Sequence, residues 1–286
     1  MPMAANLRRL KAFGPSPGGA KKEKETMDTR PNARAETAPV IAVENLVKRY
    51  DAVVAVDGIS FTVPLGSFTA LLGGNGAGKT TTIAMLLGLV RPTSGHIVIQ
   101  GKDLARHPRE IRAQMNFQSP YADLPRRLTV RQNLNIYAKL YGVSDIAARV
   151  AELSEALDLN TLLDRPLGDL SAGQRTRAGL AKAFINKPRV VLLDEPTASL
   201  DPDTADWVRG FLENYAHEES ATFLIASHNM YEVERLCDNV LMMRKGRIVD
   251  TGAPQSLIER YGRTTLEEVF LDVARAQRTQ TEDAIL

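Results

Sequence analysis

The sequence predicts an α/β fold with a mainly parallel central sheet, an antiparallel β part near the N-terminus and a helical insert. Three observations favour this fold. A glycine-rich loop joins an apolar strand, 68–72, to an apolar helix, 83–90. The strand 190–194 is apolar at four consecutive positions, as expected for a parallel strand covered on both faces. Between these parts, apolar residues recur at helical spacing from about 128 to 163.

The 286-residue chain is long enough for one large domain with a subdomain and tails, and its 44% hydrophobic residues suffice for a sizeable core. The net charge of +2 is unevenly placed. Residues 1–40 hold eight basic and four acidic groups, which leaves 28 basic and 30 acidic groups in the other 246 residues. A body this close to neutral gives no reason to expect nucleic acid as a main partner.

The single cysteine, Cys237, cannot form an internal disulfide, which suits a reducing compartment, and its apolar surroundings indicate a small buried hydrophobe. The longest apolar run, 83–90, is far shorter than the ~20 residues that cross a bilayer, and no secretory signal is visible. We therefore expect a soluble or peripheral protein in the cytoplasm.

Residues 1–38 are rich in Pro, Gly, Ala and Lys, and we interpret them as a disordered arm; contact with anionic lipid is the alternative. The main domain is predicted at 39–260, with a helical subdomain at about 119–168. Strands are predicted at 41–50, 54–63, 68–72, within 91–101, and at 115–118, 190–194 and 222–227, with a hairpin around Lys245-Gly246.

Helices are predicted at 107–114, 172–186, 203–216 and 229–237, besides the first helix and the insert. The tail, 261–286, carries a further helix and a frayed end. Leu266, Val269, Phe270 and Val273 share one face of that helix, which is therefore expected to dock on the body or on a partner.

Gly73, Gly78, Lys79 and Thr80 fill the fixed positions of G-x-x-x-x-G-K-[ST] between a strand and a helix. Glycines let backbone N–H groups turn toward an anion, and the helix N-terminus adds partial positive charge. Lys79 would reach the β- and γ-phosphates of a nucleotide, and the Thr80 hydroxyl would complete a Mg²⁺ shell. A glycine-rich turn that matches by chance is the alternative. The predicted nucleotide contacts are Gly73, Gly74, Asn75, Gly76, Ala77, Gly78, Lys79, Thr80 and Thr81.

Asp194 and Glu195 follow the apolar part of the strand 190–194. A carboxylate at the end of a buried strand, beside a phosphate loop, is suited to holding Mg²⁺ directly or through water, and Asp194 takes this predicted role. Glu195 could orient or deprotonate an attacking water. A solvated acidic pair without chemistry is the alternative.

Leu170-Ser171-Ala172-Gly173-Gln174 precedes a predicted helix; alone, such a segment is most often an N-cap. With it, the chain resembles the ATP-binding subunits of ABC transporters over about residues 41–252. LSAGQ resembles the signature LSGGQ, GGNGAGKT the Walker A loop of P-loop NTPases and VVLLDEP the Walker B strand. Further matches are Tyr50 (adenine-stacking aromatic), Gln118 (Q-loop), Ser199-Leu200-Asp201 (D-loop) and His228 (H-switch).

The resemblance implies a head-to-tail dimer, with a second copy or a homologous ATP-binding subunit, in which two ATP lie between the subunits. One subunit's Lys79 loop would face the other's Ser171, Ala172, Gly173 and Gln174, with Asp201 at the same interface. Gln118 would meet Mg²⁺ or water and relay the state of the site to a membrane partner. His228 would contact the γ-phosphate opposite Glu195. Without the resemblance, His228 and Tyr50 would more often be structural.

Two positions depart from the family pattern. Gly74 stands where Pro is usual, which loosens the loop but keeps its N–H. Ala172 stands where Gly is usual, and its Cβ is tolerable only if φ is negative. Neither removes a reacting group, so modest effects on rate or affinity are expected.

The favoured interpretation is therefore an ATPase, with ATP and Mg²⁺ as cofactors, that drives a separate integral membrane permease from the cytoplasmic face. The tail TTLEEVFLDVA and the insert with RLTVRQNL resemble exporter-type subunits for drugs, polysaccharides or lipid-linked molecules. The alternative is a soluble ABC-type ATPase acting on DNA or ribosomes, which one P-loop, no heptad stretch and one cysteine disfavour. A binding-only module is disfavoured by the presence of both Glu195 and His228.

Overall fold

The computed structural model describes residues 38–119, 124–198 and 200–275, and every structural statement below refers to these. The predicted disordered arm, apart from residue 38, Ser199 of the expected D-loop and the predicted frayed end lie outside the described residues.

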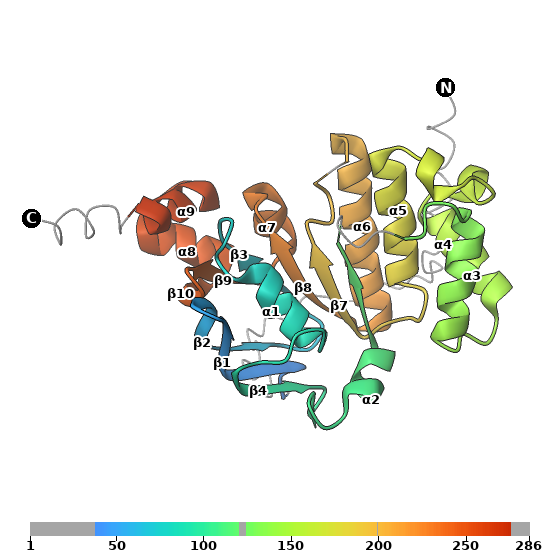
Figure 1. Ribbon diagram of the computed structural model, residues 1–286. Coiled ribbons are helices and arrows are strands. Elements are labelled where there is room, and N and C mark those ends of the chain that lie inside the picture. Colours follow the sequence, from blue (N-terminus) through green and yellow to red (C-terminus); the bar gives the residue numbers. More distant parts are fainter. Residues whose placement is uncertain (1–37, 120–123, 199, 276–286) are drawn as a thin grey trace, which may run out of the picture. The chain divides into compact units, whose positions relative to one another are not determined.

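The larger sheet of the described chain has six strands in the order β10-β9-β3-β8-β7-β6 (Figure 1). Their bounds are β3 (Phe68–Leu72), β6 (Met115–Gln118), β7 (Val190–Asp194), β8 (Thr222–Ser227), β9 (Asn239–Arg244) and β10 (Arg247–Gly252). All neighbours are parallel except β10, which pairs antiparallel with β9. The prediction of a mainly parallel central sheet is confirmed.

The smaller sheet is antiparallel and, among described residues, has the order β2-β1-β4-β5. Its strands are β1 (Ile41–Tyr50), β2 (Val53–Val63), β4 (Ser94–Ile99) and β5 (Lys102–Asp103). This confirms the antiparallel part near the N-terminus; only the short β5 was not predicted from the sequence.

The described helices are α1 (Lys79–Leu86), α2 (Pro108–Ala113), α3 (Val130–Leu140), α4 (Ile146–Ala156), α5 (Ala172–Ala183), α6 (Pro202–Glu219), α7 (Met230–Leu236), α8 (Pro254–Tyr261) and α9 (Leu266–Arg275), with 3₁₀ turns at Asn160–Leu162 and Leu167–Asp169. The predicted bounds of the first helix, 83–90, are wrong at both ends. The helix begins at Lys79, directly after Gly78 with φ of 104°, and it ends at Leu86, before the chain turns at Gly88 with φ of 67°. The helix α8 was missed.

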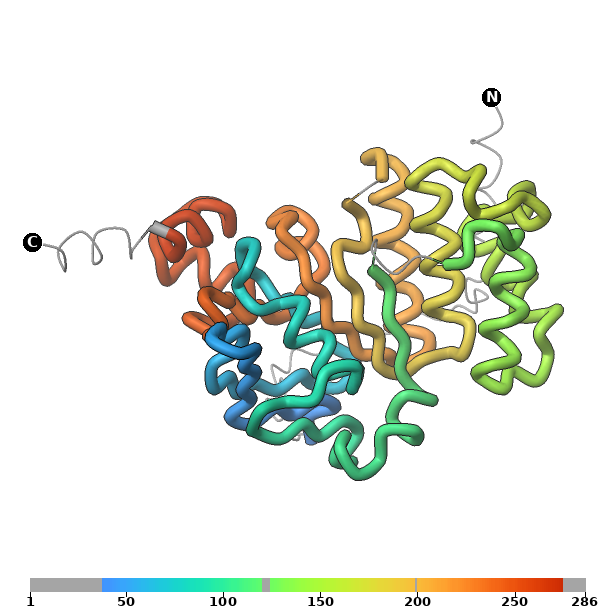
Figure 2. The backbone as a smooth tube through the Cα atoms, in the orientation of Figure 1, coloured from blue at the N-terminus to red at the C-terminus, as the bar shows by residue number. Residues whose placement is uncertain are grey.

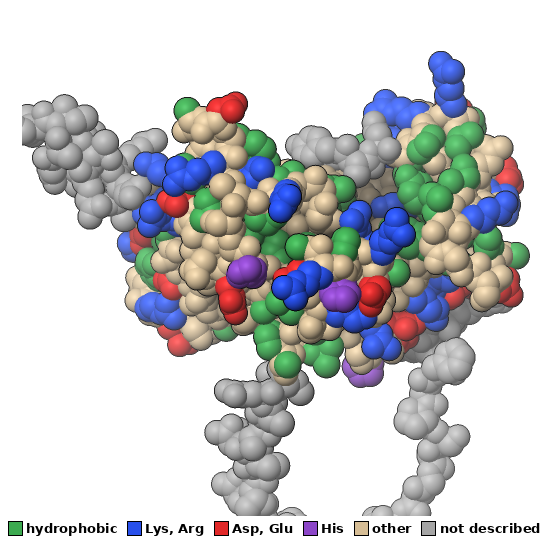
Figure 3. All heavy atoms as spheres, turned by 60° about the horizontal axis from the view of Figure 1, so that its bottom comes forward, with side chains coloured by type: hydrophobic (Ala, Val, Ile, Leu, Met, Phe, Trp, Pro, Cys, Tyr) green, Lys and Arg blue, Asp and Glu red, His purple; other side chains and the backbone are tan. Residues whose placement is uncertain are grey.

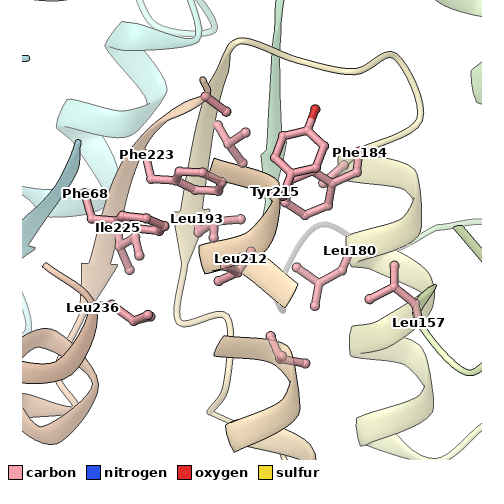
Figure 4. Packing of buried hydrophobic residues seen from close by; sticks show 14 of the residues in the cluster. Phe68, Leu157, Leu180, Phe184, Leu193, Leu212, Tyr215, Phe223, Ile225 and Leu236 are labelled. Atoms are coloured by element: carbon pink, nitrogen blue, oxygen red, sulfur yellow. The ribbon is translucent and has the colours of Figure 1, made fainter. Parts of the chain in front are cut away.

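The continuous apolar strands are explained by two cores, one on each face of the larger sheet. Successive strand residues point to opposite faces, so Phe223 and Ile225 join one core while Leu224 and Ala226 join the other. On the first face the rings of Phe223 and Phe68 stack with their centroids 4.5 Å apart (Figure 4). The second core lies between the sheet, α1 and the antiparallel strands.

The insert is a set of helices between β6 and β7. The chain runs through α3 and α4 and returns along α5, as the backbone tube in Figure 2 shows. A capping box of Thr129 and Gln132 starts α3. The buried guanidinium of Arg149 on α4 donates to the carbonyls of Phe184 and Ile185 at the end of α5, which ties these two helices together.

The C-terminal helix α9 packs against α7 and α8. Leu266, Val269 and Val273 are buried in the first core, and the Leu266 N–H donates to the Glu234 carboxylate. The apolar face of this helix is therefore covered by the chain itself. In the described part of the chain, no helix combines the length and the apolarity that crossing a membrane requires. On the face shown in Figure 3, basic and acidic side chains are interspersed.

Candidate active site

Four neighbouring strands of the described sheet, β3, β8, β7 and β6, end at one edge. Their register places Leu72 beside Ser227, Ala226 beside Asp194 and Leu193 beside Gln118. Because all four are parallel, the segments that follow them meet at the same level, where ligands bind in open α/β sheets. This brings the glycine loop, the Asp194-Glu195 pair, His228 and Gln118 to one edge.

The loop after β3 needs glycine at two positions. A Cβ on Gly73 would lie 2.5 Å from the carbonyl oxygen of Met243, and one on Gly78 would lie 2.7 Å from that of Ala55. Around Gly74, by contrast, a Cβ would meet nothing within 4 Å, so the departure from Pro leaves open space there. The helix that follows has no side-chain cap, which leaves the N–H groups of its first turn available to an anion. The loop therefore fits a nucleotide phosphate.

The Lys79 ammonium lies within this loop. Its Nζ donates to the carbonyl of Gly73 at 2.5 Å and to that of Gly74 at 3.3 Å. Partial burial lowers the pKa of Lys79, while the negative charges of Glu195 and Asp194 act in the opposite direction. The cation and the two acidic groups are therefore close enough to influence one another.

Asp194 is buried at the end of β7, and burial raises the pKa of its carboxyl. The Ser119 hydroxyl opposes this rise by donating to Asp194 Oδ2 at 3.2 Å. Asp194 and the exposed Thr80 supply oxygen atoms of the kind that Mg²⁺ prefers, so these two residues fit the predicted metal. Gln118 is also buried, and its amide is packed against Gly179 of α5.

Glu195 and His228 contact each other directly. His228 Nδ1 lies 2.5 Å from Glu195 Oε1, and the His228 N–H donates to the same oxygen at 3.0 Å. Glu195 is a non-glycine residue in the left-handed region, with φ of 51°, and its N–H donates to Ala226 O at 2.8 Å. Such strain is common where a side chain must be aimed at a site. The His228 side chain is 72% exposed and thus open to a ligand.

The segment from Ser171 to Gln174 starts α5 with a capping box, in which Ser171 Oγ accepts from the Gln174 N–H and Gln174 Oε1 accepts from the Ser171 N–H. Ala172 lies in the first helical turn with negative φ, as its Cβ requires. Asp201 is the N-cap of α6, and its carboxylate accepts from the N–H and from the hydroxyl of Thr204, without the reciprocal bond of a capping box.

Tyr50 ends β1 with 44% of its surface exposed, and Lys48 Nζ lies 4.8 Å from its ring centroid. Within the described residues, Tyr50, Ser171 and Asp201 form no hydrogen bond or ion pair with Lys79, Asp194, Glu195 or His228. The structure thus gathers the phosphate loop, the acidic pair, His228 and Gln118 at one edge of the sheet, without direct polar contacts to Tyr50, Ser171 or Asp201 in the described part of the chain. The roles predicted for all these residues remain predictions.

Sequence reasoning missed Ser119, Thr197, Ser227 and Glu232, which all hydrogen-bond at or behind this edge. Ser119 and Ser227 each adjoin a predicted residue at a strand end, which is a usable signal. Glu232 follows Asn229 by three positions, a spacing that indicates a helix cap and conceals its other contacts.

Comparisons with known proteins agree with this geometry. The ABC transporter family model matches residues 56–198. Nod factor export ATP-binding protein I of Burkholderia orbicola (strain AU 1054) is 40% identical over 77% of this chain and 72% of its own length. The ABC transporter ATP-binding protein NatA of Bacillus subtilis (strain 168) is 34% identical over 76% of this chain and 89% of its own length.

Solved structures are similar over nearly their whole length. An ATP-binding subunit of an ABC transporter has a TM-score of 0.76 at 28% identity, with 82% of this chain and 99% of that chain covered. The protein cbiO1 from Clostridium perfringens, part of the ABC transporter complex cbiONQ, has a TM-score of 0.69 at 29% identity, with 85% of this chain and 99% of that chain covered.

Proposed function

Because the chain belongs to the ABC transporter family of ATP-binding subunits, we propose that it works as one half of a dimer that powers an exporter. The chain is an ATPase, and its hydrolysis of ATP is coupled to transport. The dimer, the individual site residues and the export of a drug, polysaccharide or lipid-like cargo are our proposals.

The contact between Glu195 and His228 carries the proposed chemistry. ATP supplies the γ-phosphoryl group that water attacks in line. Glu195 orients this water and accepts its proton, and His228 holds the carboxylate in position and faces the γ-phosphate. Lys79 and the N–H groups of the loop and of the first turn of α1 hold the phosphates. Thr80, Asp194 and Gln118 would hold Mg²⁺, which would neutralise phosphate charge.

A second ATP-binding subunit, identical or homologous, completes each site. The N–H groups at the start of α5 form no hydrogen bond with the described phosphate loop of the same chain, and Ser171 is exposed. A helix N-terminus attracts anions, so this segment suits the γ-phosphate held by a partner's loop. Closure around ATP is then a population shift driven by a ligand that binds the closed pair more tightly.

Export is supported by the names of the relatives, several of which are Nod factor export ATP-binding proteins from Burkholderia species. The membrane partner is supported by cbiO1, which is part of a transporter complex. We place the chain at the cytoplasmic face of the membrane, bound to an integral permease that selects the cargo.

Replacement of Glu195 by Gln tests the chemistry. We expect turnover to fall by about two orders of magnitude or more while ATP stays bound, because the base is lost and the phosphate loop is intact. Glu155→Gln, an exposed position on α4, is the matched control. Unchanged turnover of Glu195→Gln would remove Glu195 from the mechanism.

Affinity purification of the tagged chain from detergent-solubilised membranes tests the partner. A stoichiometric polytopic membrane protein is the expected companion, and its fold would indicate the cargo class. Recovery from cytosol with ribosomes or DNA, and without a membrane protein, would instead support the soluble ATPase that is the second candidate.

A further inference from the structure

A buried acid lies behind the Glu195–His228 pair. Glu232, in the first turn of α7, is 1% exposed and is the most buried carboxylate among the described residues. Its Oε1 is 2.8 Å from the Thr197 hydroxyl, and its Oε2 is 2.9 Å from the Ser227 hydroxyl. Thr197 lies two residues after Glu195, and Ser227 immediately precedes His228. One carboxyl group thus joins the two segments that carry the proposed chemistry.

The Ser227 hydroxyl has one proton to donate but two carboxyl oxygens within reach, one from Glu232 and one from Glu195. Its Oγ accepts from the Asn229 N–H at 3.0 Å and lies 2.9 Å from Glu232 Oε2 and 3.5 Å from Glu195 Oε2. A serine hydroxyl donates one hydrogen bond and accepts two. If both carboxyl groups were ionised, they would compete for this single proton, and Glu195 would lose because it is farther away.

A proton on Glu232 Oε2 satisfies the whole group. Glu232 then donates to Ser227, Ser227 donates to Glu195, and Glu232 Oε1 still accepts from Thr197. Burial, the strongest influence, and the charge of Glu195 both raise the pKa of Glu232; the hydrogen bonds from Thr197 and Ser227 and the positive charge of Arg209 act against this. The buried thiol of Cys237 is a further titratable group whose ionisation is coupled to that of Glu232, and burial raises the pKa of this thiol.

We propose that Glu232 is a positioning residue for ATP hydrolysis, which stays neutral and holds Glu195 through the hydroxyl of Ser227. No bond is made or broken on Glu232, and its proton stays with it during turnover. This inference rests on the proposed role of Glu195 as the base.

Two substitutions of Glu232 separate positioning from folding. Glu232→Gln keeps a donor and an acceptor in the shape of a neutral acid, so we expect it to retain more than about a third of the wild-type kcat. Glu232→Ala removes both, and we expect kcat to fall about tenfold or more, with the KM for ATP changed less than about threefold. If Glu232→Gln loses as much activity as Glu232→Ala, the proposal that Glu232 is neutral is wrong.

Ser227→Ala should lower kcat about as much as Glu232→Ala, and the double variant should be no more than about threefold worse than either, because the two residues act as a unit. Ser154→Ala is the control for removal of a buried hydroxyl, since Ser154 is 0% exposed and donates to Val150 O at 2.6 Å on α4. Independent, multiplicative losses would overturn the relay.

The pH profile of kcat distinguishes the two roles, because a purely structural role of Glu232 would leave the shape of this profile unchanged. Toward alkaline pH, ionisation of Glu232 draws the Ser227 proton away from Glu195, so the wild-type kcat should decline, and Glu232→Gln should lack this decline. Superimposable profiles would contradict the proposal. Failure of the base itself is recognised separately, because Glu195→Gln would then leave turnover intact.

Discussion

Gly179 of α5 is the position where one added methyl group tests how Gln118 is held. A Cβ at Gly179 would lie 2.5 Å from Gln118 Nε2, 2.6 Å from its Oε1 and 2.7 Å from its Cδ. Carbon contacts become favourable only near 3.5 Å, so Gly179→Ala must displace the buried amide by about 1 Å. The helix itself gains up to about 1 kcal/mol, because alanine is the better helix former.

We therefore expect Gly179→Ala to keep or raise the melting temperature while lowering ATP turnover about 10- to 100-fold, the cost of misplacing a catalytic group by this distance. Steady-state ATPase assays and thermal unfolding of the same preparations measure both. Gly210→Ala on α6 is the matched control, since its Cβ would meet nothing within 4 Å, and it should leave turnover unchanged. Wild-type turnover in Gly179→Ala would refute the conclusion that packing against Gly179 positions the Gln118 amide for catalysis.

Three further predictions concern single residues. Gly78 has φ of 104°, and an added Cβ would lie 2.7 Å from Ala55 O. Gly78→Ala should therefore lower the melting temperature and abolish ATP binding in a fluorescent-nucleotide titration. Tyr50→Ala should raise the Kd for ATP about tenfold and Tyr50→Phe much less, as expected for a stacking aromatic. Burial lowers the pKa of Lys182 to about 8, so the folded protein binds fewer protons there than the unfolded chain. The free energy of unfolding relative to Lys182→Met should therefore rise by about 3 kcal/mol between pH 7 and 10.5 in urea titrations.

The sequence predicted what depends on local pattern. The spacing of Gly78, Lys79 and Thr80 indicated the phosphate loop, and the apolar run before Asp194 indicated a strand buried on both faces, because each signal lies within a few neighbouring residues. The helix α8 was missed although Pro254 and Gly262 mark its ends.

Contacts between distant segments could not be predicted in this way. The position of the Gln118 amide depends on Gly179, and the hydrogen bond from Ser119 to Asp194 depends on the pairing of β6 with β7. At Glu232 the local pattern was misleading. The Asn229 N–H, which a capping box would direct to the Glu232 side chain, donates to Ser227 instead, and this frees Glu232 to bind both flanking segments.

The helix α5 connects two parts of the proposed cycle. Its N-cap is Ser171, which in the proposed dimer faces the partner's nucleotide, and Gly179 lies eight positions, or about 12 Å, further along the helix axis. One further turn on, the Lys182 ammonium donates to Phe117 O at 3.0 Å, directly before Gln118. A helix moves as a rigid body over this length, so a shift of Ser171 toward a partner's ATP must also move the groups that hold Gln118. These contacts are worth only about 1 kcal/mol each, which binding of a nucleotide can easily outweigh. The state of one site can therefore reach Gln118 of the other through a single helix, and Gly179→Ala should weaken this coupling without unfolding the helix.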